Sequence, residues 1–172
     1  DAPAGVQNAF YAVHADDELP FGPGPESGLS VAVVGAGPAG VSCATYLRRL
    51  GFAVTIFEKR RLPGGLNTFG VAEYKMDRRT SIEELRLLFR LGCSVVTDRE
   101  VGRDLDPKKL LRDFDAVFLG PGLAGTRNLG IPGSDLPGTV DALSFIERVK
   151  AHHGRGLPSG DRVVVVGGGN TA

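Results

Sequence analysis

The chain has 172 residues, of which 42% are hydrophobic and 23% charged, enough apolar material for one folded domain with a substantial core. Its 20 basic and 20 acidic residues give a net charge of zero, which argues against nucleic acid as a partner because phosphate backbones are bound by a basic excess. The two cysteines, Cys43 and Cys93, are too few for a zinc site, an iron–sulfur cluster or a disulfide framework, and such low usage fits a cytoplasmic protein.

No stretch predicts a membrane segment or an export signal. The uncharged run at residues 31–47 is shorter than the ~20 residues of a membrane-spanning helix and is interrupted by glycine and proline. It also lies too far from the first residue to be a signal peptide. The chain starts at Asp1 and stops just after a glycine cluster, so we interpret it as a piece of a longer protein.

From residue 29 onward, β-branched runs alternate with helical segments. Residues 1–28 are interpreted as a lead-in, with a short amphipathic helix at 6–14 followed by a linker rich in proline and glycine. Strands are expected at residues 30–35, 53–58, 93–97, 116–120 and 162–166. Helices are expected at residues 39–50, 82–91, 107–112 and 141–152, with a long loop at 60–80.

Local signals mark the ends of these helices. Ser81 and Glu84 have the spacing of a capping box, Asp106 precedes a proline suited to a first helical position, and Gly51 ends the first helix. Strands that alternate with helices imply right-handed crossovers and a mainly parallel sheet. The predicted fold is therefore an α/β, Rossmann-like domain at residues 29–160, followed by the first strand and turn of a second such domain at 161–172.

A glycine fingerprint follows the first predicted strand. Gly35, Gly37 and Gly40 have the G-x-G-x-x-G spacing between a strand and a helix, which permits a tight turn, close approach of a pyrophosphate and close packing of the helix. Glu58 ends the next strand, where a carboxylate accepts hydrogen bonds from an adenosine ribose and repels a 2′-phosphate. This favours FAD or NAD over NADP; the alternative is a glycine turn of purely structural use.

A glycine pair after this acid favours FAD over NAD. Gly64 and Gly65 would let the backbone lie against the pyrophosphate and ribitol of an extended flavin nucleotide, although an ordinary β-turn is the alternative. Lys59 and Lys75, in the same basic stretch, are candidates for contacts with the flavin. We interpret the remaining bases of this stretch as a solvated face: Arg60, Arg61, Arg78 and Arg79.

Two further glycine clusters follow later strands. Gly120 and Gly122 come after the strand at 116–120, at the edge where open α/β sheets bind ligands, unless they form only a turn. Gly167, Gly169 and Ala172 form a second fingerprint, which predicts a nicotinamide nucleotide site. The residue that would choose between NAD and NADP lies ~20 residues beyond such a motif, so that choice stays open. We find no catalytic side-chain constellation, in agreement with a flavin that carries its own redox chemistry.

Three motifs in this order resemble the FAD-dependent pyridine nucleotide oxidoreductase superfamily: VAVVGAGPAG with its continuation to residue 76, AVFLGPGLAG with its continuation, and RVVVVGGGNTA. Within it, residues 29–172 are similar to glutamate synthase small chains and to the flavin-bearing half of dihydropyrimidine dehydrogenases. The resemblance implies that hydride passes from NAD(P)H to FAD, and that electrons leave through iron–sulfur clusters of a partner domain or subunit.

The resemblance also implies individual contacts. FAD contacts are implied at Gly37, Pro38, Ala39, Gly40, Val41, Glu58, Lys59, Gly65 and Leu66. Lys75 matches a position held by a basic residue, and Val101 one whose backbone meets the adenine. NAD(P)H contacts are implied at Gly169, Asn170, Thr171 and Ala172.

The expected function is that of an NAD(P)H-dependent FAD oxidoreductase that feeds an iron–sulfur partner. The chain departs from the family in two ways: it has no cysteine-rich cluster domain ahead of the flavin domain and no later Gly-Asp segment that returns to the flavin. We therefore expect these 172 residues alone to be inactive with NADH or NADPH. The alternatives are a non-catalytic dinucleotide-binding regulatory module and a fragment of a flavin monooxygenase.

Overall fold

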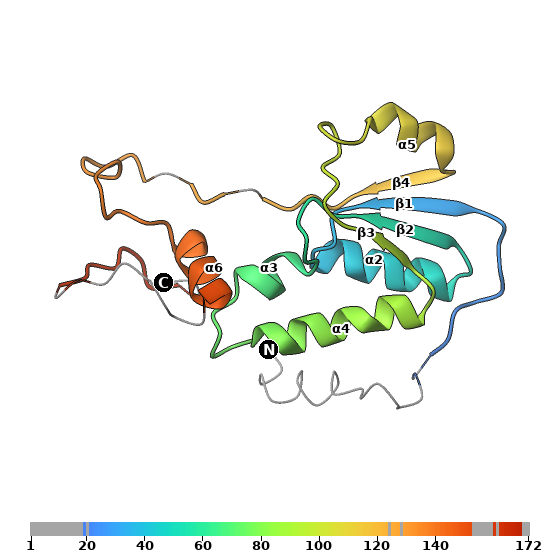
Figure 1. The fold of residues 1–172 in the computed structure, drawn as a ribbon, viewed down its shortest axis with the longest axis horizontal. Helices are drawn as coiled ribbons and strands as arrows, with labels where there is room; N and C mark the ends of the chain where they lie inside the picture. Colours follow the sequence, from blue (N-terminus) through green and yellow to red (C-terminus); the bar gives the residue numbers. More distant parts are fainter. Residues whose placement is uncertain are drawn as a thin grey trace.

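A computed structural model describes residues 19, 21–123, 125–127, 129–152, 160 and 162–169. The helix predicted at residues 6–14 lies outside the described residues. Four strands form one sheet: β1 (Ser30–Val34), β2 (Ala53–Phe57), β3 (Ser94–Val96) and β4 (Ala116–Leu119). The sheet has the order β3-β2-β1-β4 and every neighbouring pair is parallel, which confirms the predicted parallel sheet (Figure 1).

The central strand β1 is buried on both faces. Val33 pairs in register with Ile56 of β2 on one side and with Phe118 of β4 on the other. The side chains of Val31, Ala32 and Val33 are all buried. A parallel strand covered on both faces needs consecutive apolar residues rather than an alternating pattern, and this explains the run of β-branched residues in the sequence.

Helices cover the two faces of the sheet. Those of the main body are α2 (Pro38–Arg49), α4 (Arg78–Arg90) and α5 (Pro107–Asp113). Helices α2 and α4 lie on one face and α5 on the other (Figure 1). The chain moves from β1 outward to β3 and then returns to the far side of β1 as β4, so the order reverses beside β1. Such a switch point opens a crevice at the carboxyl ends of the strands.

Two of the predicted helix ends are confirmed. Gly51, just beyond α2, has a φ of +88°, the left-handed conformation that commonly ends a helix. The carboxylate of Asp106 accepts a hydrogen bond from the backbone N–H of Lys108 at 2.9 Å and so caps α5. Within the described residues, no helix has the length and apolar character needed to cross a bilayer.

The predicted start of α4 is wrong. The helix begins at Arg78, and its N-cap is Asp77, whose carboxylate accepts a hydrogen bond from the backbone N–H of Thr80 at 2.9 Å. Ser81 instead faces α3 (Gly65–Phe69) from inside the helix, with its Oγ 2.7 Å from that of Thr68. No capping box forms, because the N–H of Ser81 donates to the carbonyl of Asp77 at 3.3 Å, and Glu84 Oε1 is buried with no hydrogen-bond partner among the described residues. Both Asp77 and Ser81 suit a cap, and the earlier one prevails because the intervening arginines extend the helix.

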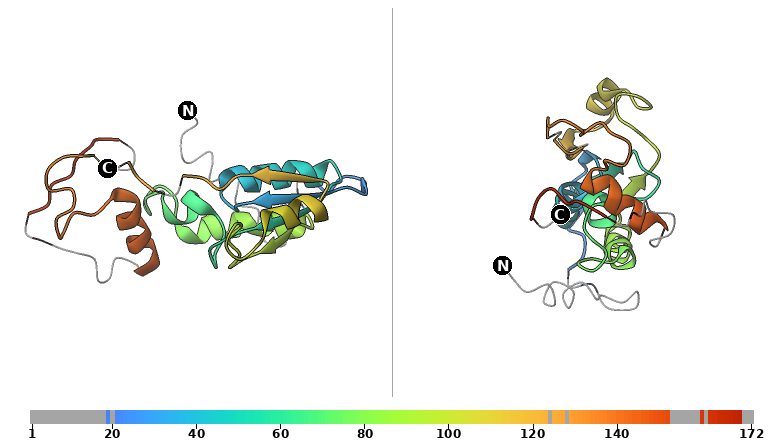
Figure 2. Two further views of the ribbon diagram at one scale, coloured as in Figure 1. Left: turned by 90° about the horizontal axis from the view of Figure 1, so that it is seen from above. Right: turned by 90° about the vertical axis from the view of Figure 1, so that its left-hand side faces the viewer.

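Two other predicted segments also differ. The stretch at 60–80, expected to be a loop, contains α3 and the first turn of α4. The strand predicted at 162–166 is absent, and the side chains of residues 163–166 are 63–87% exposed. A strand needs a neighbour to satisfy its backbone groups, and the described residues place none beside this segment. The last helix, α6 (Ala142–His152), confirms the prediction and stands away from the sheet beside α3 (Figure 2).

Replacing the cap of α4 should destabilise the fold. Asp77→Ala should lower the free energy of unfolding by about 1 kcal/mol, since a backbone N–H loses its acceptor. The hydrogen bonds from Thr80 hold the pKa of Asp77 below its ordinary value. The cap's contribution is therefore complete above the ordinary carboxylate pKa and is lost as the pH falls through the lowered value. Urea unfolding at several pH values measures both effects, and Asp135→Ala in an exposed turn is the control; an equal loss in that control would contradict the assignment.

Candidate dinucleotide-binding site

Two glycines of the first fingerprint are required by packing. Gly35 has a φ of +97°, and a Cβ there would lie 2.3 Å from the carbonyl oxygen of Gly120. A Cβ on Gly40 would lie 1.9 Å from the carbonyl oxygen of Gly35. Real Cβ atoms do not approach oxygen so closely, so the turn after β1 and the packing of α2 both depend on these glycines.

Gly37 is different, because the protein leaves space in front of it. Its backbone is extended, with φ −81° and ψ −178°, a conformation open to any residue. Among the described residues, a Cβ there would meet only the Cα of Gly65, at an ordinary contact distance of 3.8 Å. The fold itself therefore does not demand glycine at this position. The open space fits the predicted close approach of a pyrophosphate to the backbone.

The N-terminus of α2 is suited to a phosphate group. In the part of the chain that the structure describes, no side chain caps this end of the helix, and its first turn holds no acidic residue. Pro38 and Ala39 are exposed there, while Val41 is half-buried against the core. The first N–H groups of a helix carry partial positive charge, so an uncapped terminus of this kind favours an anion.

Glu58 is held directly beside the glycine turn. The residue is 7% exposed, and its Oε2 accepts a hydrogen bond from the backbone N–H of Ala36 at 2.8 Å. Its Oε1 accepts a second from the backbone N–H of Arg60 at 2.9 Å. An ionised carboxylate has about four acceptor positions, so capacity remains for ribose hydroxyls. Glu58 thus stabilises the loop as well as being available to a nucleotide.

The glycine pair packs against the same loop. Gly64 and Gly65 have φ values of +110° and +53°, and the N–H of Gly64 donates to the carbonyl of Ala36 at 2.7 Å. A Cβ on Gly65 would lie 2.7 Å from the Cα of Gly37, and one on Gly64 would lie 1.9 Å from Thr68 Oγ1. The positive φ values and these close contacts explain why both positions hold glycine. Ala36, which the sequence analysis did not single out, is hydrogen-bonded to both Glu58 and Gly64.

The cluster after β4 is only partly brought to this site. The N–H of Gly120 donates to the carbonyl of Val34 at 2.8 Å, and Gly120 also borders Gly35. Gly122 has a φ of +70°, but no atom lies within 4 Å of a Cβ built on it. We call the turn at residues 35–37, together with Gly64 and Gly65, the cradle. Gly120 borders the cradle, whereas Gly122 lies outside its contacts.

Four further predicted residues lie in the segments that follow β2 and β3. Lys59 is exposed immediately after Glu58, and Leu66 is 51% exposed at the start of α3. Lys75 lies in the turn before α4, with its Nζ 5.5 Å from the centre of the Tyr74 ring. Val101 forms a bridge with Leu105 in the loop after β3. That loop begins beside the acid, because the N–H of Arg99 donates to the carbonyl of Glu58 at 3.0 Å.

The second fingerprint forms no cradle in the part of the chain that the structure describes. Gly167 has a φ of +126°, and a Cβ on Gly169 would have no neighbour within 4 Å. The predicted contacts at Asn170, Thr171 and Ala172 fall outside the described residues. The nicotinamide site therefore stays a prediction.

The prediction of a solvated arginine face is wrong for Arg78, which donates to the carbonyl of Lys150 at 3.4 Å, and for Arg60. Its guanidinium pairs with the carboxylate of Glu147 in α6 and lies 4.5 Å above the centre of the Phe69 ring. Arg79 does behave as predicted, since it pairs with Glu83 on the surface of its own helix. Sequence patterns around Arg60 cannot reveal a partner in α6, which is distant in the chain.

A doubly wound parallel sheet, with an open glycine cradle and an acid at its switch point, defines a Rossmann-type dinucleotide-binding domain. The chain belongs to the pyridine nucleotide-disulphide oxidoreductase family, whose model matches residues 29–172. This confirms the superfamily that the sequence motifs indicated.

Known relatives agree with this family. The chain is 37% identical over 163 residues to the NADPH-Fe(3+) oxidoreductase subunit beta of Geobacter sulfurreducens, covering 89% of this chain and 23% of that protein. It is 41% identical over 152 residues to the glutamate synthase [NADPH] small chain of Halomonas elongata, covering 83% and 32%. The structure of Mycobacterium tuberculosis FprA in complex with NADPH matches with a TM-score of 0.65 and 28% identity, covering 75% and 30%. The chain thus spans about a quarter to a third of these proteins.

The contrast between Gly37 and Gly40 can be tested by mutation. Gly37→Val should abolish FAD retention in the complete natural protein, because its side chain fills the space that faces the ligand, while the free energy of unfolding falls by only about 1 kcal/mol. Gly40→Ala should destabilise the fold by about 3 kcal/mol through its contact with Gly35. Flavin absorbance and thermal unfolding separate the two effects. Full flavin occupancy in Gly37→Val would refute the cradle.

Proposed function

We propose that residues 29–160 form the FAD-binding part of an NADPH-dependent oxidoreductase that passes electrons to an iron–sulfur domain or subunit. The observation that carries the proposal is the junction at Ala36. Its N–H donates to Glu58, and its carbonyl accepts from Gly64. These two hydrogen bonds hold Glu58 and the Gly64–Gly65 pair against the first glycine turn, so that one nucleotide could contact all three.

Each part of this surface has a task in binding the nucleotide. The open face at Gly37 and the uncapped end of α2 would take the pyrophosphate. Glu58 would accept the ribose hydroxyls and repel a 2′-phosphate, which selects FAD over an NADP-type nucleotide at this site. The second wall, made by Gly64 and Gly65, suits a nucleotide that continues past the pyrophosphate, as FAD does.

Bound FAD supplies the hydride-accepting chemistry, so the chain itself has to bind and orient rather than react. Residues 161–172 would begin the NADPH-binding domain that presents hydride to the flavin. NADPH is preferred over NADH because the names of the Geobacter, Halomonas and Mycobacterium proteins all specify it. Two of these relatives are named as a subunit and a small chain, which supports an electron-accepting partner subunit. We place the protein in the cytoplasm.

The proposal is tested on the complete natural protein purified without added nucleotide. The protein should carry FAD, and anaerobic NADPH should bleach its visible absorbance faster than NADH does. A protein without flavin would instead be a dinucleotide-binding regulatory module. NADPH oxidation that consumes oxygen and hydroxylates an organic substrate would identify a flavin monooxygenase. The 172 residues alone should show no dye reduction, since hydride transfer requires the nicotinamide ~3–3.5 Å from the flavin.

Substituting Glu58 should lower the affinity for FAD and change which nucleotide the site prefers. Glu58→Ala should lower FAD affinity by about 1.5–3 kcal/mol, because the ribose loses a charged acceptor and the N–H of Ala36 loses its partner. Glu58→Gln keeps one oxygen acceptor and should mainly reduce the preference for ADP over its 2′-phosphorylated form. Competition titrations measure both, with Glu83→Gln on the surface of α4 as the control. Unchanged affinities would show that Glu58 only stabilises the loop.

A further inference from the structure

Helix α6 buries a lysine completely. The side chain of Lys150 has 0% of its surface exposed and is among the largest fully buried side chains in the described residues. Lysine is almost never buried to this extent without partners, because its ammonium group has to be removed from water. Such a residue calls for a specific role at its position.

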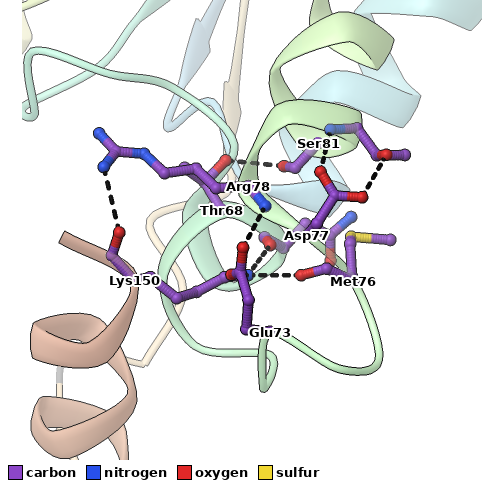
Figure 3. A network of polar contacts seen from close by, with 9 residues as sticks. Thr68, Glu73, Met76, Asp77, Arg78, Ser81 and Lys150 are labelled. Carbon is purple, nitrogen blue, oxygen red and sulfur yellow. Dashed lines mark hydrogen bonds and ion pairs between the residues drawn. The ribbon is translucent and has the colours of Figure 1, made fainter. Parts of the chain in front are cut away.

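Three acceptors surround the ammonium group of Lys150 (Figure 3). Its Nζ donates to the carbonyl oxygens of Met76 at 2.8 Å and Asn67 at 3.2 Å, and it lies 3.7 Å from Glu73 Oε2. The two carbonyls accept two of the three N–H donors of the ammonium, and Glu73 balances its charge as an ion pair. Burial lowers the pKa of Lys150, and the carboxylates of Glu73 and Asp77 act against this shift.

The acceptors all belong to one short segment beside the cradle. Asn67 lies in α3, whereas Glu73 and Met76 lie in the turn that leads to α4. One cation from α6 therefore holds both ends of residues 67–76. Unlike a bond between neighbours in a helix, these contacts connect positions far apart in the chain and depend on the docking of α6.

A hydroxyl pair links this segment to the glycine turn. Thr68 Oγ1 donates to the carbonyl of Pro63 at 3.0 Å and lies 2.7 Å from Ser81 Oγ. Because the single hydroxyl hydrogen of Thr68 serves Pro63, Ser81 is the donor in the second contact. A Cβ on Gly64 would lie 1.9 Å from Thr68 Oγ1, so the turn rests directly on this side chain. A shift of α3 would therefore move the wall of the cradle.

Further contacts dock α6 on the same region. The guanidinium of Arg78 donates to the backbone carbonyl of Lys150 at 3.4 Å (Figure 3). One turn earlier in α6, Glu147 pairs with Arg60. Ile146, on the same helix, is 8% exposed. Helix α6 thus binds the flank of the cradle rather than the sheet.

We infer that Lys150 is a positioning residue that couples the docking of α6 to the shape of the dinucleotide cradle. With α6 docked, residues 67–76 are held and the glycine turn stays against Gly37. Coupling of this kind is reciprocal, so a bound dinucleotide must in turn favour docked α6. Helix α6 precedes the second fingerprint in the sequence. This inference rests on the proposed function.

The test uses Lys150→Met in the complete natural protein, which keeps the length of the side chain and removes its charge. FAD affinity of the apoprotein should fall about five- to fifty-fold, within the range of ordinary coupling energies. Amide hydrogen exchange should speed up in both α6 and residues 64–76. In the unmutated protein FAD should slow exchange in α6, and in the variant this effect should be lost; a merely structural lysine would not produce that difference.

Two further variants keep the experiment decisive. Lys109→Met removes an exposed lysine that pairs with Asp113 in α5, and it should change nothing. If Lys150→Met does not fold, Arg60→Gln removes the pairing of Arg60 with Glu147 of α6 and should likewise lower FAD affinity. Loss of protection in α6 with FAD affinity within twofold of the original would overturn the inference.

Failure of the proposed function gives a different result. If the unmutated protein binds no FAD, hydrogen exchange of residues 64–66 in the nucleotide-free variant still decides the link. Faster exchange there would support the coupling of Lys150 to the glycine turn, and unchanged exchange would refute it.

Discussion

The site depends on the two hydrogen bonds made by Ala36. Its N–H is held by the carboxylate at the end of β2, and its carbonyl accepts from the N–H of Gly64. Ala36 itself is fully buried, so neither group can turn to water. Backbone groups without partners are costly in such a place, and the acid and the glycine turn are thereby fixed relative to the phosphate loop.

This constraint separates two uses of glycine within one motif. Gly35 and Gly40 face backbone oxygens at distances that exclude any side chain, so packing alone explains them. Gly37 faces open space and has an extended backbone that other residues also adopt. Only the second kind of glycine points to a ligand. A fingerprint that contained only packing glycines would be equally consistent with a structural turn.

Local patterns predicted the sheet, its helices and the cradle, because glycine spacing and β-branched runs act over a few residues. The start of α4 was missed because Asp77 and Ser81 are both good caps, and the buried contact of Ser81 with Thr68 cannot be read from spacing. The strand predicted at 162–166 had the right composition but needs a neighbouring strand to form. The partners of Lys150 and Arg60 lie across the fold, and no local signal announces them.

The burial of Lys150 favours a single docked position of α6 over maximal stability. A buried ionic group often contributes little net stability, because desolvation offsets its attraction to partners. An apolar face of α6 alone, around Ile146, could slide along α3 with small loss, since apolar contacts have no direction. Two carbonyls and a carboxylate at separate places in residues 67–76 favour one position of the ammonium, because hydrogen bonds are directional. Because these contacts are directional, a shift of α6 would move residues 67–76 and with them the cradle. A purely apolar contact would allow α6 to shift without moving them.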